Sequence, residues 1–222
     1  MARMQRGPEL LSAASGHAMN ICQHVIVPER WVVQGVDHMT SNTTEPCRRR
    51  YGAALWAGVL AGIIGAIVKF GWEVPLPPRT AARNATNPPQ QLLQQLGFSE
   101  HFTHMSYTFS GWPLPFVSFI VHFGFSIFSA IVYALLAEKH PRVKLWQGAV
   151  FGLAIWVLFH LILMPAMGTV PAPWHQPFDE HLSESFGHVF WMWVIELTRR
   201  DLRNRITGEP DAEVPLPALG GN

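Results

Sequence analysis

Four apolar segments constrain this chain more than any other feature of its sequence. A bilayer's hydrocarbon core requires about 20 predominantly apolar residues of a spanning helix, and three of the segments reach that length. The fourth is a little shorter and carries ionisable residues. The segments are residues 51–72, 114–137, 145–167 and 183–198. They predict an all-α integral membrane protein whose four transmembrane helices pack as a bundle.

Positive charge is distributed unevenly around these segments. Arg and Lys cluster before the first segment, between the second and third, and after the fourth, whereas the other two connections contain few or none. The clusters are Arg48 to Arg50, then Lys139, Arg142 and Lys144, then Arg199, Arg200, Arg203 and Arg205. Short loops rich in Lys and Arg remain in the cytoplasm. All three clusters share that side only if each segment crosses, so both termini are predicted to be cytoplasmic.

Composition agrees with a membrane protein and argues against several other classes. Hydrophobic residues make up 49% of the 222 residues and charged residues only 14%, which is too apolar for an ordinary water-soluble surface. The basic clusters are explained as topology signals, so we expect the lipid bilayer and no nucleic acid as a partner. The chain lacks the GxSxG, HExxH and glycine-rich phosphate-loop motifs. We therefore predict no catalytic residues, no cofactor and no enzymatic activity.

Two terminal segments flank the predicted membrane domain of residues 48–207. Residues 1–47 show no sustained apolar periodicity, and we expect a flexible cytoplasmic segment there. Prolines and glycines interrupt residues 208–222, which predicts a flexible cytoplasmic tail.

Small residues recur along one face of the first apolar segment. Gly58 and Gly62 are four residues apart, and Gly65 lies in the adjacent row of small residues. In lipid, such a face lets two helix backbones approach closely and drives their association by dispersion contacts. The face predicts helix packing, either within the bundle or in a homo-oligomer or a complex with another membrane protein.

Ionisable residues inside the apolar segments form the candidate site. At about 1.5 Å of helix rise per residue, they all fall in the half of the membrane away from the basic clusters. They are Lys69, Glu73, His122, His160, Glu184 and His188. Intramembrane ionisable groups mark a functional site by default. Four uses remain open: hydrogen bonds that hold helices together, a proton- or ion-responsive site, metal or haem ligation, and a site for another small ligand. No tight ligand spacing is present, so we predict no metal site.

Several stretches of the chain resemble a known family. They are RRRYG at 48–52, VKFGWEVPLPPR at 68–79, KLWQG at 144–148, SESFGHVFWMWVIE at 183–196 and RRDLRNRIT at 199–207. The chain resembles the YagU-like inner-membrane proteins of Gram-negative bacteria, which are largely uncharacterised, from about residue 39 to 214. The resemblance implies the bacterial inner membrane and a link to acid tolerance. It also implies a translation start at Met39, with residues 1–38 untranslated.

Together these observations predict an inner-membrane protein whose Lys/Glu/His cluster lies in the outer leaflet, responds to protons and contributes to acid tolerance. The alternative is a non-catalytic scaffold or an accessory subunit of a membrane complex. In that case the cluster only holds helices together, and the small-residue face recruits a partner.

Overall fold

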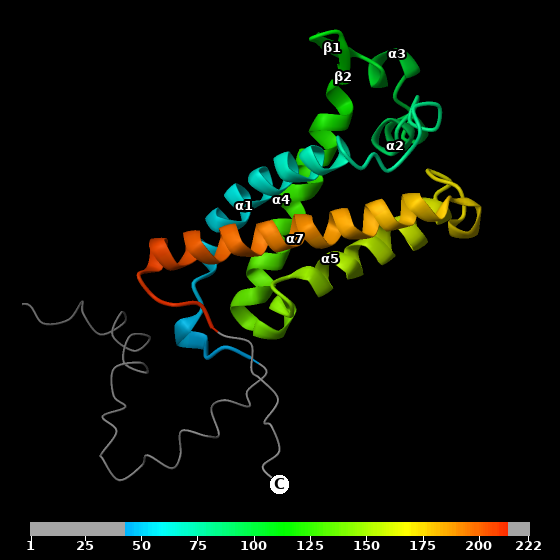
Figure 1. Cartoon of the computed structure of the whole chain (residues 1–222). Coiled ribbons are helices and arrows are strands. Elements are labelled where there is room, and N and C mark those ends of the chain that lie inside the picture. Colours follow the sequence, from blue (N-terminus) through cyan, green and yellow to red (C-terminus); the bar gives the residue numbers. More distant parts are fainter. Residues whose placement is uncertain (1–42, 213–222) are drawn as a thin grey trace, which may run out of the picture.

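The computed structural model describes residues 43–212, and helices dominate this part of the chain (Figure 1). The predicted terminal segments, 1–47 and 208–222, lie mostly outside the described residues. The main helical elements are a short 3₁₀ turn η2 (Pro46–Arg48), α1 (Tyr51–Glu73), α4 (Phe116–Lys139), α5 (Ala149–Trp156), a π-helical stretch η4 (Val157–Leu163), α6 (Met164–Ala166) and α7 (Phe178–Thr207). The prediction of a mostly helical membrane protein is confirmed.

Three helices of the described residues are long and apolar enough to cross a membrane. They are α1, α4 and the continuous stretch Ala149–Ala166. The third begins later than the predicted residue 145 because a 3₁₀ turn, η3 (Pro141–Lys144), precedes it and the backbone at Trp146, Gln147 and Gly148 has positive φ. The helix α7 is longer than its predicted span. Its 30 residues include charged residues in both end regions.

The helix α1 lies between α4 and α7, and α5 packs along another side of α7 (Figure 1). Small residues explain these close contacts. A Cβ atom added to Gly62 would lie 2.5 Å from the Cα atom of Ile127 on α4. On the adjacent row, a Cβ atom at Gly65 would lie 2.6 Å from Cγ1 of Ile195 on α7. Gly58 also faces the α4 backbone, so the small-residue face of α1 packs within this chain.

A buried serine links three of these helices. The Ser126 hydroxyl on α4 donates a 2.7 Å hydrogen bond to the Gly62 carbonyl on α1. The same hydroxyl oxygen accepts a 2.9 Å bond from Nε1 of Trp191 on α7. Apolar side chains surround this link and form the core of the bundle: Ala61, Ala130, Tyr133, Ile155, Trp191, Met192 and Ile195.

A small lobe stands between α1 and α4 at one end of the bundle. It contains α2 (Pro88–Gln95), α3 (Glu100–Thr103) and an antiparallel hairpin of β1 (Ser106–Phe109) and β2 (Trp112–Pro115). The hairpin turn consists of Ser110 and Gly111, both with positive φ, as a type I′ turn requires. The second apolar segment was predicted to begin at residue 114. That boundary is wrong by two residues, because 114 and 115 pair with β1.

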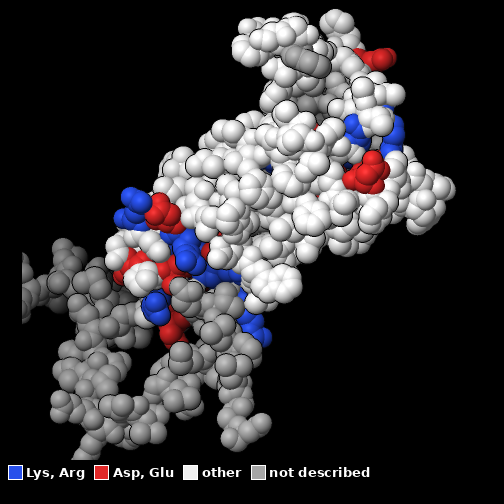
Figure 2. Space-filling view, in the orientation of Figure 1, with Lys and Arg blue, Asp and Glu red and all other residues white. Residues whose placement is uncertain are grey.

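Charged side chains gather at the two ends of the bundle and leave an uncharged band between them (Figure 2). On α7, Glu184 belongs to one end and Arg199 to the other, about 22 Å apart along the helix. The short 3₁₀ turn η5 (Pro173–His175) precedes α7 at the Glu184 end.

Candidate functional site

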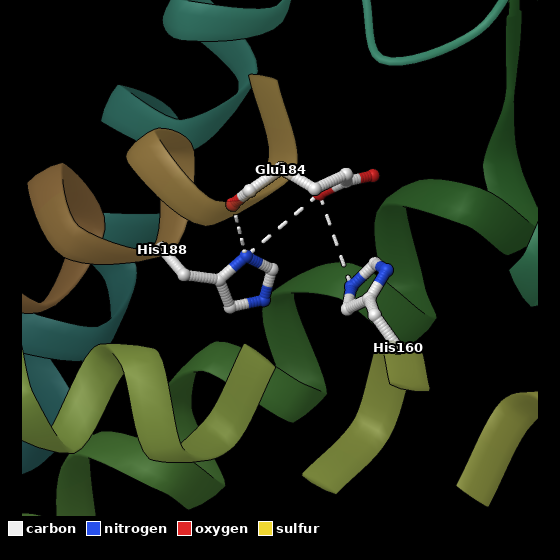
Figure 3. Close-up of side chains that lie close together, drawn as sticks. All are labelled: His160, Glu184 and His188. Carbon is white, nitrogen blue, oxygen red and sulfur yellow. Dashed lines mark hydrogen bonds and ion pairs between the residues drawn. The ribbon is translucent and has the colours of Figure 1, made fainter. Parts of the chain in front are cut away.

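Glu184 is the centre of the charged group at one end of the bundle. Its Oε2 atom lies 3.2 Å from Nζ of Lys69 on α1, and its Oε1 atom lies 3.3 Å from Nη2 of Arg79. Two imidazoles face the same carboxylate: Oε2 is 3.7 Å from Nδ1 of His188 and 3.8 Å from Nε2 of His160 (Figure 3). The Glu184 side chain is buried. A single carboxylate therefore meets groups from α1, η4, α7 and the segment after α1.

Two further carboxylates pair with the same cations. Glu73 accepts a 2.8 Å hydrogen bond from Nζ of Lys69. Glu180 lies 3.0 Å from Nε of Arg79 and also pairs with Arg83. We call the following residues the Glu184 cluster: Lys69, Glu73, Arg79, Arg83, His160, Glu180, Glu184 and His188. With both histidines neutral, its three cations balance its three carboxylates.

The residues that α7 contributes to the Glu184 cluster all lie on one face of this helix. Glu180, Glu184 and His188 are four residues apart, so their side chains lie one above another. The last turn of α1 and the segment after it are held against the same helix. Nε1 of Trp72 donates to the Ser183 carbonyl at 3.2 Å, and the Ser183 hydroxyl donates to the Leu76 carbonyl at 2.7 Å. These contacts bring Arg79 back over the cluster.

His160 reaches the cluster from the π-helical stretch η4. The proline at 165 has no N–H to donate to the preceding turn, and π-helical turns occur frequently at functional sites. The ring centroid of His160 lies 4.8 Å from that of His188, with the rings nearly perpendicular. The π-helical stretch η4 thus presents an imidazole to α7.

The hydrogen bonding of His188 shows which ring nitrogen carries the hydrogen when the imidazole is neutral. Its Nδ1 atom lies 2.8 Å from the Glu184 backbone carbonyl. A carbonyl oxygen only accepts hydrogen bonds, so Nδ1 carries the hydrogen. The Nε2 atom is then the position at which neutral His188 takes up a proton.

The structure brings five of the six predicted site residues together and separates the sixth. The five are Lys69, Glu73, His160, Glu184 and His188. His122 on α4 instead lies between aromatic rings, 4.1 Å from Phe70 and 6.4 Å from Phe123 by ring centroids. On α1 the side chains of Phe70 and Lys69 point about 100° apart. Phe70 therefore faces His122 on α4, whereas Lys69 faces Glu184 on α7. The His122 Nε2 atom is buried and has no hydrogen-bond partner in the described part of the chain.

Three residues of the cluster were not among the predicted site residues. Arg79 and Arg83 counted only as isolated loop charges, and Glu180 precedes the predicted fourth span. Glu180 had a detectable signal, because it stands one helical turn before Glu184. Nothing in the local sequence around Arg79 indicates that the chain returns to α7.

His160, Glu184 and His188 also form a candidate metal-ligand group, since their ligand atoms all lie within 4.8 Å of one another. Three observations argue against a divalent ion. Glu184 already pairs with Lys69 and Arg79, Nδ1 of His188 donates to a carbonyl, and the cluster is charge-balanced without an ion. A metal would add two uncompensated charges, so these residues do not fit a metal site.

A small open cavity of about 180 Å³ borders the cluster. Arg79, Arg83 and Glu180 line it, together with prolines from the segment after α1 and from the start of α7. Glu184 does not line this cavity, but Arg79 forms part of the cavity wall and contacts the Glu184 carboxylate.

A second charged group occupies the opposite end of the bundle. We call it the Asp211 cluster; it contains Arg50, Glu138, Lys144, Glu196, Arg199, Arg203, Glu209 and Asp211. Glu138 accepts hydrogen bonds from Nε of Arg203 at 2.9 Å and from the Arg50 backbone N–H at 2.7 Å. Arg199 donates two bonds to Glu196, at 2.7 and 2.9 Å. Four cations here balance four carboxylates.

Asp211 joins this cluster although the sequence placed it in a flexible tail. It pairs with Arg199 and, at 2.8 Å, with Lys144. Burial opposes ionisation of Asp211, but these two cations outweigh it and hold its pKa below the usual range. The residues that immediately follow α7 therefore contact the bundle.

Comparisons with known proteins agree with the membrane architecture. A family model described as a protein of unknown function, DUF1440, matches residues 63–197. The chain is 42% identical over 196 residues to a protein of Escherichia coli (strain K12) named inner membrane protein YagU. That match covers 78% of this chain and 95% of the relative. No solved structure matches.

Proposed function

Because this chain belongs to the DUF1440 family and is a multi-pass inner-membrane protein similar to YagU, we propose that its Glu184 cluster is a proton-responsive site that contributes to acid tolerance. One observation carries the proposal: two histidines and a lysine share the Oε2 atom of one buried carboxylate. Histidine is the side chain whose ordinary pKa, near 6.5, lies within the range of mild acid. The link to acid tolerance comes from the resemblance to the YagU-like proteins.

We propose four spans with both termini in the cytoplasm, which places the Glu184 cluster in the outer half of the membrane. The helix α7 supports the fourth crossing. It packs against α1 and α5, and no Asp, Glu, Lys or Arg lies between Glu184 and Glu196 along it. The basic connections then share the cytoplasmic side, as the positive-inside rule requires.

Protonation of either histidine changes the charge balance of the cluster. The neutral cluster has three cations and three carboxylates, so one added proton leaves a net charge of +1 inside the bundle. The new imidazolium competes with Lys69 and Arg79 for the Glu184 carboxylate. A second protonation is opposed because the two rings lie only 4.8 Å apart. One proton therefore loosens the contacts that Glu184 makes with α1 and with the segment after it.

Other charged groups shape this response from every side of the cluster. Glu73 and Glu180 hold Lys69 and Arg79 when Glu184 turns to an imidazolium. His181 on α7 and His122 on α4 also lie near enough to interact electrostatically with the cluster. The open cavity lined by Arg79, Arg83 and Glu180 exposes this edge of the cluster to the outside.

The competing function is a non-catalytic scaffold or accessory subunit in which the cluster only ties helices together. One observation favours it: each carboxylate of the cluster already has a cationic partner. However, the small-residue face expected to recruit a partner is covered by α4 and α7. Neither function requires a catalytic step.

Survival after acid challenge distinguishes the two functions. A deletion strain is complemented with wild type, His160→Gln, His188→Gln or the double variant, at matched membrane abundance. We expect the double variant to lose protection while remaining folded. His101→Gln, at an exposed position of the lobe, is the matched control and should protect like wild type. Full protection by the double variant contradicts the proton-responsive function and leaves the scaffold.

A further inference from the structure

The lobe between α1 and α4, with the Asn87 cap of α2 and residues 88–115, is fastened to the bundle by side-chain hydrogen bonds. Nδ2 of Asn87 donates to the Ser118 hydroxyl on α4 at 2.7 Å. Nε2 of Gln95 donates to the Met167 carbonyl at 3.0 Å, and the Thr169 hydroxyl donates to Gln95 at 2.9 Å. The lobe therefore has a fixed position beside the end of the bundle that carries the Glu184 cluster (Figure 1).

Large apolar side chains are exposed over this lobe. Tyr107 and Phe109 are 57% and 62% exposed and, two residues apart on β1, project from one face of the hairpin. Further exposed apolar side chains come from α3 and from the connections on either side of it: Leu96, Phe98, Phe102 and Met105. Among residues 88–115 the one Asp, Glu, Lys or Arg is Glu100. Large exposed apolar side chains gathered in a segment with one charged residue indicate an interaction site.

The hairpin itself argues against another strand as the occupant of that surface. In a two-residue hairpin, the pair next to the turn, Phe109 and Trp112, exchanges backbone hydrogen bonds. Pro113 and Pro115 then fall at positions facing away from β1, where they supply no N–H to a new strand. Prolines on an edge strand are a device against strand addition. An isolated two-stranded hairpin is also marginal in water, so its apolar face needs a different environment.

That environment is adjacent. β2 runs directly into α4, whose first turns expose Phe116 by 48% and Ile120 by 71%. Because α4 is a membrane-spanning helix, these side chains face lipid. The exposed surface of the lobe continues this lipid-facing surface without an intervening charged residue between Tyr107 and Ile120.

We infer that the lobe is an interfacial membrane anchor: it inserts its exposed aromatic side chains into the leaflet beside it, at the level of the lipid headgroups. Aromatic side chains favour this zone, and interfacial segments bury their apolar face about 5–10 Å into the boundary of headgroups and acyl chains. The anchor fixes the segment that leads from α1 to α4. This inference does not depend on the proton response.

Fluorescence quenching in proteoliposomes tests the anchor. In the full chain, Cys22 and Cys47 are replaced by Ser, and Phe109→Cys carries an environment-sensitive NBD label. The vesicles contain phosphatidylcholine with a doxyl quencher either near the headgroup or deep in the acyl chain. We expect strong quenching by the shallow doxyl lipid, less by the deep one, and little by iodide in the buffer. Ala82→Cys, at an exposed position outside the apolar surface, is the matched control and should show the reverse.

A label at Leu96 repeats the measurement from the end of α2, so distortion of the hairpin by its label leaves the inference testable. Quenching of both lobe labels by iodide, to the extent seen at Ala82, overturns the anchor. Lobe labels that are shielded from iodide in native membranes but not in proteoliposomes indicate a protein partner, and this result also overturns it.

Discussion

The Glu184 and Asp211 clusters lie at opposite ends of one bundle and are both charge-balanced, yet they are built from different side chains. In the Asp211 cluster, arginines make paired or multiple hydrogen bonds, as Arg199 does with Glu196 and Arg203 with Glu138. In the Glu184 cluster, one carboxylate is shared by a lysine, an arginine and two histidines at longer distances. Four cations and four carboxylates hold one another at one end, and one carboxylate faces two histidines at the other.

This difference indicates that the Asp211 cluster is a fixed structural contact and that the Glu184 cluster responds to pH. An arginine keeps its charge at every physiological pH, and its fork geometry favours one fixed arrangement with a carboxylate. A histidine changes charge within the range that bacteria meet in mild acid. We therefore expect the Asp211 cluster to hold the ends of α4 and α7 together while the Glu184 cluster rearranges.

Glu138→Ala should have the largest effect, because it removes the buried partner of Arg203 and of the Arg50 backbone N–H. Loss of one member of a buried ion pair costs about 3–5 kcal/mol of unfolding free energy. Thermal unfolding in mild detergent measures it. Arg205→Ala breaks an exposed pair with Asp201 and should leave the unfolding temperature unchanged. If Glu138→Ala and Arg205→Ala changed the unfolding temperature equally, the Asp211 cluster would not stabilise the bundle as proposed.

Asp211→Asn should cost about 1.5–3 kcal/mol near neutral pH, as expected for hydrogen bonds to a charged group. The folded-state pKa of Asp211 is depressed, so its contribution is complete above its ordinary value of 3.8 and disappears as the pH falls below that value. The difference in unfolding temperature between variant and wild type should therefore be the same at about pH 7 and about pH 5. If the difference in unfolding temperature between Asp211→Asn and wild type were smaller at about pH 5 than at about pH 7, the Asp211 cluster would itself respond to mild acid, which contradicts its role as a fixed contact.

Gly62→Ala tests the close contact between α1 and α4 in the part of the bundle that lies between the two clusters. The new Cβ atom would meet the Ile127 backbone at 2.5 Å, so we expect a loss of about 1–3 kcal/mol from overpacking. Gly71→Ala, on the same helix, meets nothing within 4 Å and should be neutral or stabilising by up to about 1 kcal/mol. Both stabilities come from the same unfolding assay in detergent. Tolerance of both substitutions would mean that α1 and α4 move apart readily.

The smallest effect on stability belongs to His188→Gln, which removes one neutral hydrogen bond worth about 0.5–1.5 kcal/mol. Combined with His160→Gln, this substitution should nevertheless abolish the pH dependence. Between about pH 7 and pH 5, the unfolding temperature of wild type should change more than that of a His160→Gln, His188→Gln double variant. If the unfolding temperatures of wild type and the double variant depended on pH in the same way, the two histidines would not make the Glu184 cluster pH-responsive.

The sequence predicts those parts of the fold that depend on local pattern. The apolar run that starts at Tyr51 ends within one residue of the predicted boundary, because a helix in lipid satisfies its backbone internally and follows its apolar length. The extension of α7 to Phe178 and Thr207 was missed because both end regions are charged. Those charges are compensated by residues distant in sequence, such as Glu138 for Arg203. Hydropathy contains no information on such pairing.

The candidate site divides in the same way. Helical rise alone predicted that Lys69, His160 and Glu184 lie at one level, and the structure places them in contact. The same arithmetic grouped His122 with them, because depth does not specify which neighbour a helix face meets. Arg79 was missed for a related reason: a proline-rich exit from α1 has no periodicity from which its return to α7 can be predicted.

A distance measurement at both ends of the bundle tests the central claim most directly. Spin labels replace Val74 and Met167 near the Glu184 cluster, or Tyr51 and Trp146 near the Asp211 cluster, all of them exposed positions, after Cys22 and Cys47 are changed to Ser. Double electron–electron resonance is recorded in lipid at about pH 7 and about pH 4, the second well below the ordinary histidine pKa. We predict that the Val74–Met167 distances change with pH, that the Tyr51–Trp146 distances do not, and that His160→Gln with His188→Gln abolishes the change. Distances at the Glu184 end that are identical at both pH values would contradict the account.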